Sequence, residues 1–244
     1  MSSQLAAGMS DMLGALTRER VRQEVCVAEQ RRFHFRSLVA VVLTAVLWIA
    51  AGAQETDAEL ERFHRVDDLL TALEARPGSI IADVGAGDGF FAVRVARAVA
   101  PGGRAVAVDI SDTALAKLRE RATRENVAVD VVLGAADDPH LAAGQFDAVL
   151  IHNAYHEMTA HEAMLTHIYA ALKPGGRLLM VEPMHETSRG LPRDKQVAQH
   201  DIDADIADRE LRDAGFDIGQ RSDLFVKFGP GFPGGFWLIL ARRP

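Results

Sequence analysis

One twelve-residue segment, residues 80–91, constrains the fold of this chain more than any other, and it reads IIADVGAGDGFF. A short run rich in β-branched residues ends in an acidic residue and is followed by three glycines at alternate positions and by a helix-forming stretch. This order predicts a strand, a tight turn and a helix, which bring the backbone close to a nucleotide-like ligand at the carboxyl edge of a parallel sheet. The glycines are expected there because a Cβ would collide with the ligand or exclude the required backbone angles.

The spacing of the glycines indicates which ligand is expected. A dinucleotide-binding turn reads G-x-G-x-x-G, and its third glycine would fall at position 90, which is Phe90. Here the spacing is G-x-G-x-G, with Asp83 two residues upstream of Gly85. This pattern resembles the first motif of class I S-adenosylmethionine-dependent methyltransferases.

The remaining chain alternates β-like and α-like segments with Gly/Pro punctuation, which predicts an α/β fold with a doubly wound parallel sheet. The resemblance implies a Rossmann-like sheet of seven strands, mostly parallel with a reversed last strand and with helices on both faces. We expect one leading helix over 57–74, within a segment 54–78, and a methyltransferase domain over 79–244. Predicted strands are 80–84, 105–108, 127–133, 146–151, 177–181, 217–226 and 236–242. Predicted helices are 91–100, 111–121, one opened by a Thr159–Glu162 capping box, and 207–214.

Further motifs extend the resemblance over roughly residues 60–244. They are Asp109, the string at 137–139 and the Leu-Lys-Pro-Gly-Gly string at 172–176. More narrowly, residues 155–157, 200–203 and 213–216 look like those of a bacterial group of predicted, often exported methyltransferases.

The resemblance assigns the cofactor, S-adenosyl-L-methionine, to residues at four expected strand ends. Asp109 would accept hydrogen bonds from the ribose hydroxyls, although it could instead cap the helix that begins at Ser111. Asp137 would lie beside the adenine amino group, whereas Asp138 precedes Pro139 and could only shape the turn. The complete expected set is Asp83, Gly85, Ala86, Gly87, Gly89, Asp109, Ile110, Ala136, Asp137, His152 and Asn153.

Candidate catalytic residues follow the fourth strand. His156, with Glu157 beside it, is the expected general base or acceptor-orienting residue, and the alternative is a loop histidine bonded to backbone. Tyr155 could wall the pocket near the sulfonium, where aromatic faces favour cations. His200 is a further candidate from the polar segment 184–204, which we interpret as a lid.

We predict no metal ion at this edge. The set weighed was His152, His156, Glu157 and Glu182, but the acidic cluster of catechol-type relatives is not evident after the fourth strand. His161 shares a helical face with Leu165 and Ile168 and is expected to be a packed histidine.

Composition limits the class of substrate. The 244 residues carry a formal charge of −7, which argues against a nucleic-acid partner because phosphate contacts supply most of that affinity. The expected function is methyl transfer by in-line displacement to a small-molecule acceptor. The alternatives are a non-catalytic nucleoside binder and a nicotinamide-dependent oxidoreductase, against which Phe90 counts.

The N-terminal fifth suggests export. After an extension over 1–30, Arg31, Arg32 and Arg36 precede an apolar run at 38–50 and an Ala-Gly-Ala end at 51–53. This order predicts a signal peptide or signal anchor over 31–53 and a periplasmic or secreted protein. Membrane attachment through 37–53 and a buried helix of a cytoplasmic enzyme are the alternatives, and translation could start downstream of Met1. The only cysteine is Cys26.

Overall fold

A computed structural model describes residues 56–244 of the protein. The predicted extension, signal segment and membrane attachment lie outside the described residues. Over 56–244, no helix is both long and apolar enough to span a bilayer.

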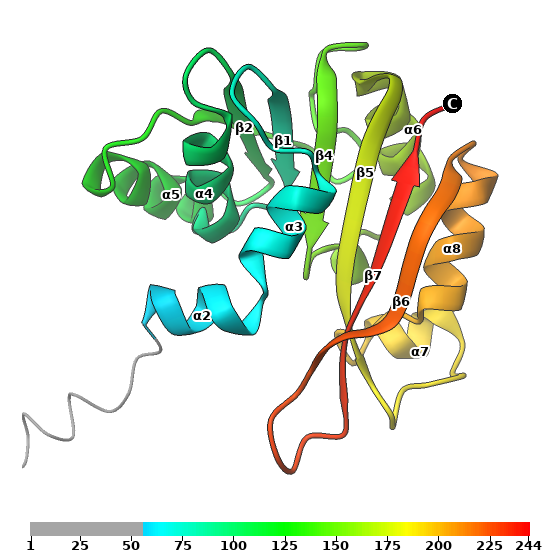
Figure 1. The fold of residues 1–244 in the computed structure, drawn as a ribbon. Coiled ribbons are helices and arrows are strands. Elements are labelled where there is room, and N and C mark those ends of the chain that lie inside the picture. Colours follow the sequence, from blue (N-terminus) through cyan, green and yellow to red (C-terminus); the bar gives the residue numbers. More distant parts are fainter. Residues whose placement is uncertain (1–55) are drawn as a thin grey trace, which may run out of the picture. The chain divides into compact units, whose positions relative to one another are not determined.

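Seven strands form one sheet in the order β3-β2-β1-β4-β5-β7-β6 (Figure 1). The strands are β1 (Ile80–Val84), β2 (Arg104–Asp109), β3 (Asp130–Leu133), β4 (Phe146–His152), β5 (Leu172–His185), β6 (Asp217–Lys227) and β7 (Gly234–Arg242). The helices are α2 (Asp57–Phe63), α3 (Val66–Ala72), α4 (Phe90–Val99), α5 (Asp112–Arg124), α6 (His161–Ala171), α7 (Arg193–Val197) and α8 (Ala204–Asp213). A short 3-10 helix, η1, spans Tyr155–Glu157.

The predicted strand directions are confirmed. Strands β1 to β5 pair in parallel, while β7 runs antiparallel between β5 and β6. The sheet is therefore mostly parallel with a reversed last strand. Because parallel strands end at the same edge, the carboxyl ends of β1 to β4 share one edge of the sheet, and those of β1, β2 and β4 point downward in Figure 1.

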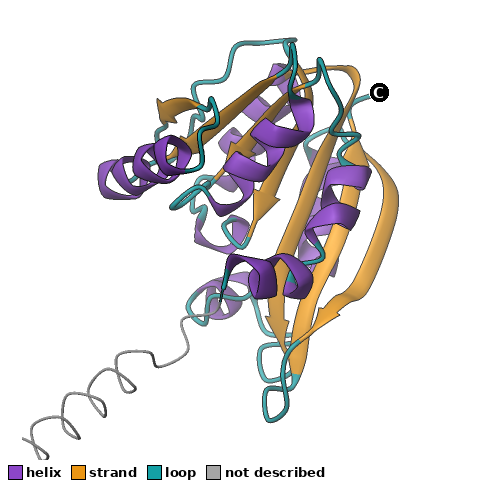
Figure 2. Cartoon of the chain, turned by 60° about the vertical axis from the view of Figure 1, so that its left-hand side comes forward, coloured by secondary structure: helices purple, strands orange, loops and turns teal. Residues whose placement is uncertain are grey.

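Helices cover both faces of the sheet (Figure 2), and each face buries its own apolar cluster. On one face, α6 and α8 place residues such as Leu165 and Leu211 against the sheet. On the other face, α3 and α4 bury Leu69 and Val95, and α5 adds Leu118 beside them. The alternating segments fold this way because parallel strands need crossover helices that shield both faces.

The prediction of one leading helix over 57–74 is wrong. The chain forms two helices, α2 and α3, because Arg65 adopts a left-handed conformation with φ of 52°. Arg65 is held there by a hydrogen bond from its guanidinium to the Phe225 carbonyl (3.1 Å) and by an ion pair with Asp68. Next to this break, the His64 ring packs against those of Phe91 on α4 and Phe236 on β7.

Smaller predictions also fail. The capping box is absent, because α6 begins after Ala160, whose side chain has no hydrogen-bond acceptor. The third strand is shorter than predicted and begins at Asp130. The fifth strand starts at Leu172 and continues to His185, and residues 173–176 bulge out of register with β4.

Candidate active site at the carboxyl edge

The carboxyl edge brings together the predicted cofactor residues from four strands. Residues 83–89 lie at the end of β1 and in the turn after it, residues 109–110 at the end of β2, residues 136–137 in the loop after β3, and residues 152–153 at the end of β4. The Asn153 amide donates to the Val181 carbonyl of β5 (2.8 Å), which holds the backbone at the end of β4 while the Asn153 side chain stays exposed. The sequence motifs therefore converge on one place in the fold.

The glycine turn is bonded to β2 through its own amides. The amides of Gly85 and Ala86 both donate to the Val108 carbonyl, at 2.8 and 3.0 Å. The Gly87 amide donates to the Asp109 carboxylate at 2.9 Å. These three N–H groups are thus already satisfied and do not point at a ligand, unlike those of a phosphate-binding turn.

Each glycine of the turn has a positive φ, but the space available for a Cβ differs among the three positions. A Cβ on Gly85 would lie 2.3 Å from the Ala154 Cβ, and one on Gly89 would lie 2.6 Å from Leu118 Cγ. At Gly87, apart from the glycine and its two chain neighbours, no atom of the described residues lies within 4 Å of such a Cβ. Gly85 and Gly89 therefore permit close packing within the protein, and Gly87 faces open space at the edge.

Asp83 is a buried carboxylate at the end of β1, with 3% of its surface exposed. It accepts a hydrogen bond from the Ala92 amide in the first turn of α4. Its Oδ2 atom has no hydrogen-bond partner among residues 56–244. Burial and the nearby charge of Asp109 raise the pKa of Asp83 from 3.8 to about 7.

Asp109 both supports the turn and remains accessible. Its Oδ2 accepts from Gly87, and its Oδ1 accepts from the Ser111 amide at 2.8 Å. Each oxygen keeps a second lone pair for another donor. The alternative that Asp109 caps the following helix is not what is observed, because Ser111 is the N-cap and accepts from the Ala114 amide.

Exposed apolar side chains flank this position at the ends of β2 and β3. Ile110 is 65% exposed and Leu133 is 46% exposed, which is unusual for large apolar residues at the ends of buried strands. Asp137 is exposed in the next loop. Asp138 shapes that loop as expected, because its carboxylate accepts from the His140 amide at 2.7 Å.

Glu182 organises the loop that follows β4, a role that the sequence did not reveal. Its side chain is fully buried, and its Oε1 accepts from the amides of Ala154 and Tyr155, both at 2.7 Å. Its Oε2 lies 2.6 Å from Nδ1 of His156. The only sequence signal was an acidic residue at a strand end on the correct edge.

His156 is held rigidly by this contact. Its side chain is 4% exposed, while the neighbouring Glu157 and His200 side chains are 67% and 76% exposed. Burial opposes a charge on the imidazole, but the hydrogen bond and the charge of Glu182 outweigh it, so that the pKa of His156 is raised. The structure brings the three predicted residues His156, Glu157 and His200 together.

The prediction for Tyr155 needs correction. Its side chain is fully buried in the core cluster, and its hydroxyl donates to Glu210 of α8 at 2.7 Å. His161 and Arg193 contact the same carboxylate at 3.3 and 2.7 Å. Tyr155 therefore anchors η1 to α8 instead of walling a pocket, and His161 is packed as predicted.

Aromatic rings gather beside the end of β4. The His152 ring lies 4.7 Å from that of His64, 4.2 Å from that of Phe91 and 5.4 Å from that of Phe236. Burial lowers the pKa of His64 to about 4 and that of His152 well below 6.5. Nδ1 of His64 and Nε2 of His152 lack partners within residues 56–244. We call these four residues the aromatic cluster.

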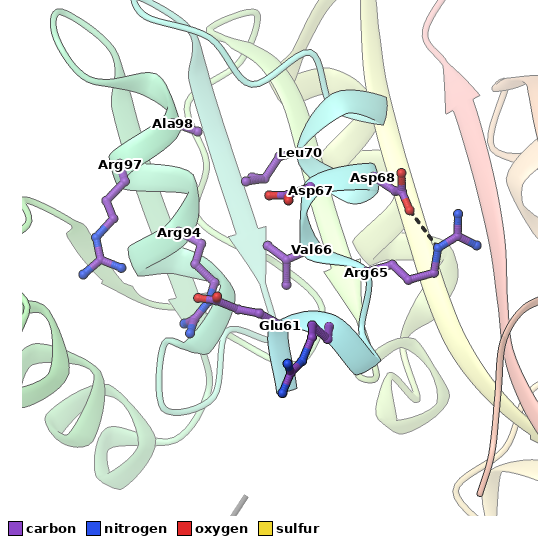
Figure 3. Close-up of a pocket in the computed structure, with 10 residues that line it drawn as sticks. Glu61, Arg65, Val66, Asp67, Asp68, Leu70, Arg94, Arg97 and Ala98 are labelled. Atoms are coloured by element: carbon purple, nitrogen blue, oxygen red, sulfur yellow. Dashed lines mark hydrogen bonds and ion pairs between the residues drawn. The ribbon is translucent and has the colours of Figure 1, made fainter. Parts of the chain in front are cut away.

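A separate cavity of about 660 Å³ lies between α2, α3 and α4 (Figure 3). Three of the arginines that line it are paired with carboxylates. Arg65 contacts Asp68, Arg94 contacts Glu61, and Arg97 contacts Glu125. None of the predicted cofactor or catalytic residues lines it, so the cavity does not belong to the site at the carboxyl edge.

Comparison with known proteins agrees with this geometry. Residues 81–176 match the protein-family model described as a methyltransferase domain. A demethylmenaquinone methyltransferase of Symbiobacterium thermophilum is 34% identical over 131 residues, which cover 53% of this chain and 51% of the relative. The chain thus spans about half the length of the curated relatives it matches.

Solved structures share the fold. A S-adenosylmethionine-dependent methyltransferase from Aquifex aeolicus has a TM-score of 0.61 at 18% identity, covering 73% of this chain and 89% of that structure. Phosphoethanolamine N-methyltransferase 2 of Haemonchus contortus, solved in complex with S-adenosyl-L-methionine, has a TM-score of 0.57 at 18% identity and covers 79% and 58%. The chain therefore shares the fold of these methyltransferases, as the sequence predicted, and its residues 81–176 match the methyltransferase-domain model.

Proposed function

We propose that the protein is a S-adenosylmethionine-dependent methyltransferase that acts on a small-molecule acceptor. The observation that supports this most strongly is the hydrogen bonding of the backbone amides in the glycine turn. Its amides at Gly85, Ala86 and Gly87 are satisfied internally, and the groups left to meet a ligand are carboxylates.

The charge of the site supports a cationic nucleoside over a dinucleotide. A pyrophosphate needs free amides and positive charge, whereas Asp83 and Asp109 lie close enough for the charge of one to raise the pKa of the other. S-adenosylmethionine carries an ammonium and a sulfonium, which such carboxylates attract. This charge pattern favours the same ligand, S-adenosylmethionine, that Phe90 predicts by replacing the third glycine of a dinucleotide-binding turn.

The remaining groups fit the other parts of the cofactor. The free lone pairs of Asp109 would accept from the ribose hydroxyls, and the exposed side chains of Ile110 and Leu133 would cover the apolar faces of the adenine. Asp137 would accept from the adenine amino group, and Asp83 would face the ammonium. When bound, the cofactor supplies an electrophilic methyl group.

The acceptor would lie between His156 and the aromatic cluster. His156 is fixed by Glu182 and orients the acceptor through its other ring nitrogen, Nε2. The rings of Phe91 and Phe236 favour an acceptor that contains an aromatic ring. The demethylmenaquinone methyltransferase among the relatives is named for an acceptor with such a ring.

Transfer of a labelled methyl group to a panel of phenols, quinols and amines tests this function. The wild type should methylate an aromatic acceptor. His156→Asn should lower kcat by about 100-fold while binding S-adenosylhomocysteine with unchanged affinity. His167→Asn, at a half-exposed site on α6, is the matched control and should retain full activity.

Two results would contradict the proposal. If wild-type protein binds S-adenosylhomocysteine but methylates no acceptor in the panel or in a cell extract, the domain is a non-catalytic binder. If His156→Asn transfers methyl groups as fast as the control, His156 does not act on the acceptor.

A further inference from the structure

Three side chains converge near the end of β4, and the proposed methyl transfer uses His156 but gives no role to Glu157 or His200. One ligating atom each from His156, Glu157 and His200 lies within 4.8 Å of the others. The His156 Nε2 to Glu157 Oε1 distance is 3.8 Å, and the His200 Nδ1 to Glu157 Oε1 distance is 3.6 Å. We propose that these residues bind a divalent transition-metal ion such as Zn²⁺.

The distances suit such an ion. Ligand bonds of about 2.1 Å at tetrahedral angles place neighbouring ligand atoms about 3.4 Å apart. The two histidine–glutamate separations exceed this value by a few tenths of an ångström, and the two histidine nitrogens lie within 4.8 Å of each other. Glu157 and His200 are mostly exposed, so rotation of their side chains is enough to close the gap.

Glu182 prepares His156 as a ligand. Because the buried carboxylate accepts from Nδ1, the lone pair of the imidazole is at Nε2, on the side that faces Glu157. Metal-binding histidines almost always donate their second nitrogen to a carboxylate or carbonyl in this way. Here the carboxylate has two further amide donors, so its position does not depend on the ion.

The surroundings favour a cation. Glu182, Glu157 and Asp201 all act on His156 electrostatically. Asp201 is fully buried next to His200, and its Oδ2 has no partner among the described residues although its Oδ1 accepts from Nδ1 of His185 at 2.9 Å. The position of His200 is fixed by the end of α7, where its amide donates to the Val197 carbonyl at 3.0 Å.

The donor set indicates the class of ion. Two imidazole nitrogens and one carboxylate oxygen suit Zn²⁺, Co²⁺, Ni²⁺ or Fe²⁺, whereas Mg²⁺ and Ca²⁺ prefer oxygen ligands. Three protein ligands leave at least one position open. With the ion bound to Nε2, His156 would orient the acceptor through the ion instead of directly, and an acceptor oxygen in the open position would be made more acidic.

This set differs from the one weighed from the sequence. His152 belongs to the aromatic cluster, and Glu182 supports the site without being a ligand. His200 lies 44 positions after His156 in the sequence, and it joins the proposed set of ligands only because the segment 184–204 folds back towards His156. The proposal does not rest on methyl transfer, because an ion can bind whether or not the domain is catalytic.

Titration of tag-free, metal-stripped full-length protein with Co²⁺ tests the site through visible absorption, and competition with Zn²⁺ gives the affinity. We expect one ion per chain and the absorption of a low-coordinate site with nitrogen ligands. His200→Ala and Glu157→Gln should each weaken Zn²⁺ binding by about 10- to 100-fold, and Glu182→Gln should do so as a positioning residue.

Exposed residues on α6 provide matched controls. His167→Ala and Glu162→Gln remove the same chemical groups and should leave the affinity unchanged. Absence of cobalt absorption at millimolar ion, or equal affinity in His200→Ala and His167→Ala, would overturn the proposal. Methyl transfer at the wild-type rate by metal-stripped protein would not affect it, because the readout is binding.

Discussion

At the scale of single residues, Asp83 connects the fold to the proposed ligand. One of its oxygens holds the first turn of α4, and the other lies buried without a partner in the described chain. A buried carboxylate beside a second carboxylate costs free energy when it ionises. A cationic ligand next to the unpartnered oxygen would offset that cost.

This cost predicts how stability depends on pH. The pKa of Asp83 is about 7 in the folded protein and 3.8 as its reference value. The folded state therefore binds the proton more tightly, so the stabilising contribution is full below pH 3.8 and is lost as the pH rises through 7. Between pH 5 and 8, the free energy of unfolding of the wild type should fall by on the order of 2 kcal/mol relative to Asp83→Asn.

Denaturant unfolding at both pH values, without ligand, measures this difference. Asp130→Asn, which alters an exposed carboxylate on β3, is the control and should show the same change in the free energy of unfolding between pH 5 and 8 as the wild type. If the free energy of unfolding of Asp83→Asn changes with pH as that of the wild type does, the pKa of Asp83 is not raised in the folded protein.

At the scale of elements, the site depends on how closely the glycine turn packs against the loop after β4. Gly85 lies so near Ala154 that a Cβ cannot be placed between them, and Glu182 fixes the loop from the other side. The turn, the loop and the end of β5 are thus one packed unit, in which a change at one element displaces the others.

Two alanine variants separate packing from backbone strain. Gly87→Ala introduces only an unfavourable φ and should cost about 1–2 kcal/mol of stability. Gly85→Ala adds the clash with Ala154 and should cost at least about 2 kcal/mol more. Thermal and denaturant unfolding compare the two, and equal losses would contradict the close approach of turn and loop.

The elements also show what the sequence can predict. Strand directions and the order of helices followed from alternating segments, because each crossover needs its own helix and turn residues. The break at Arg65 was missed because it depends on the Phe225 carbonyl, 160 positions away. The roles of Tyr155 and Glu182 were missed for the same reason, since Glu210 and the 154–156 amides are distant in sequence and leave no local pattern.

At the scale of the whole molecule, the charge and the fold agree. The chain carries −7 overall, and the carboxyl edge concentrates carboxylates at the ends of β1, β2 and β5. The reversed strand β7 is tied to the segment 184–204, because the Trp237 indole donates to the Ile202 carbonyl at 2.6 Å. The segment 184–204, predicted as a lid, contains buried Gln196 and Asp201 and carries His200 to the site.

Isothermal titration calorimetry with S-adenosylmethionine, S-adenosylhomocysteine and the nicotinamide dinucleotides tests the central claim most directly. The wild type should bind both adenosyl ligands at one site per chain and should not bind the dinucleotides. Asp109→Asn should weaken binding by about tenfold or more, since it removes a charge-assisted acceptor. Binding of a nicotinamide dinucleotide without binding of S-adenosylhomocysteine would contradict the account.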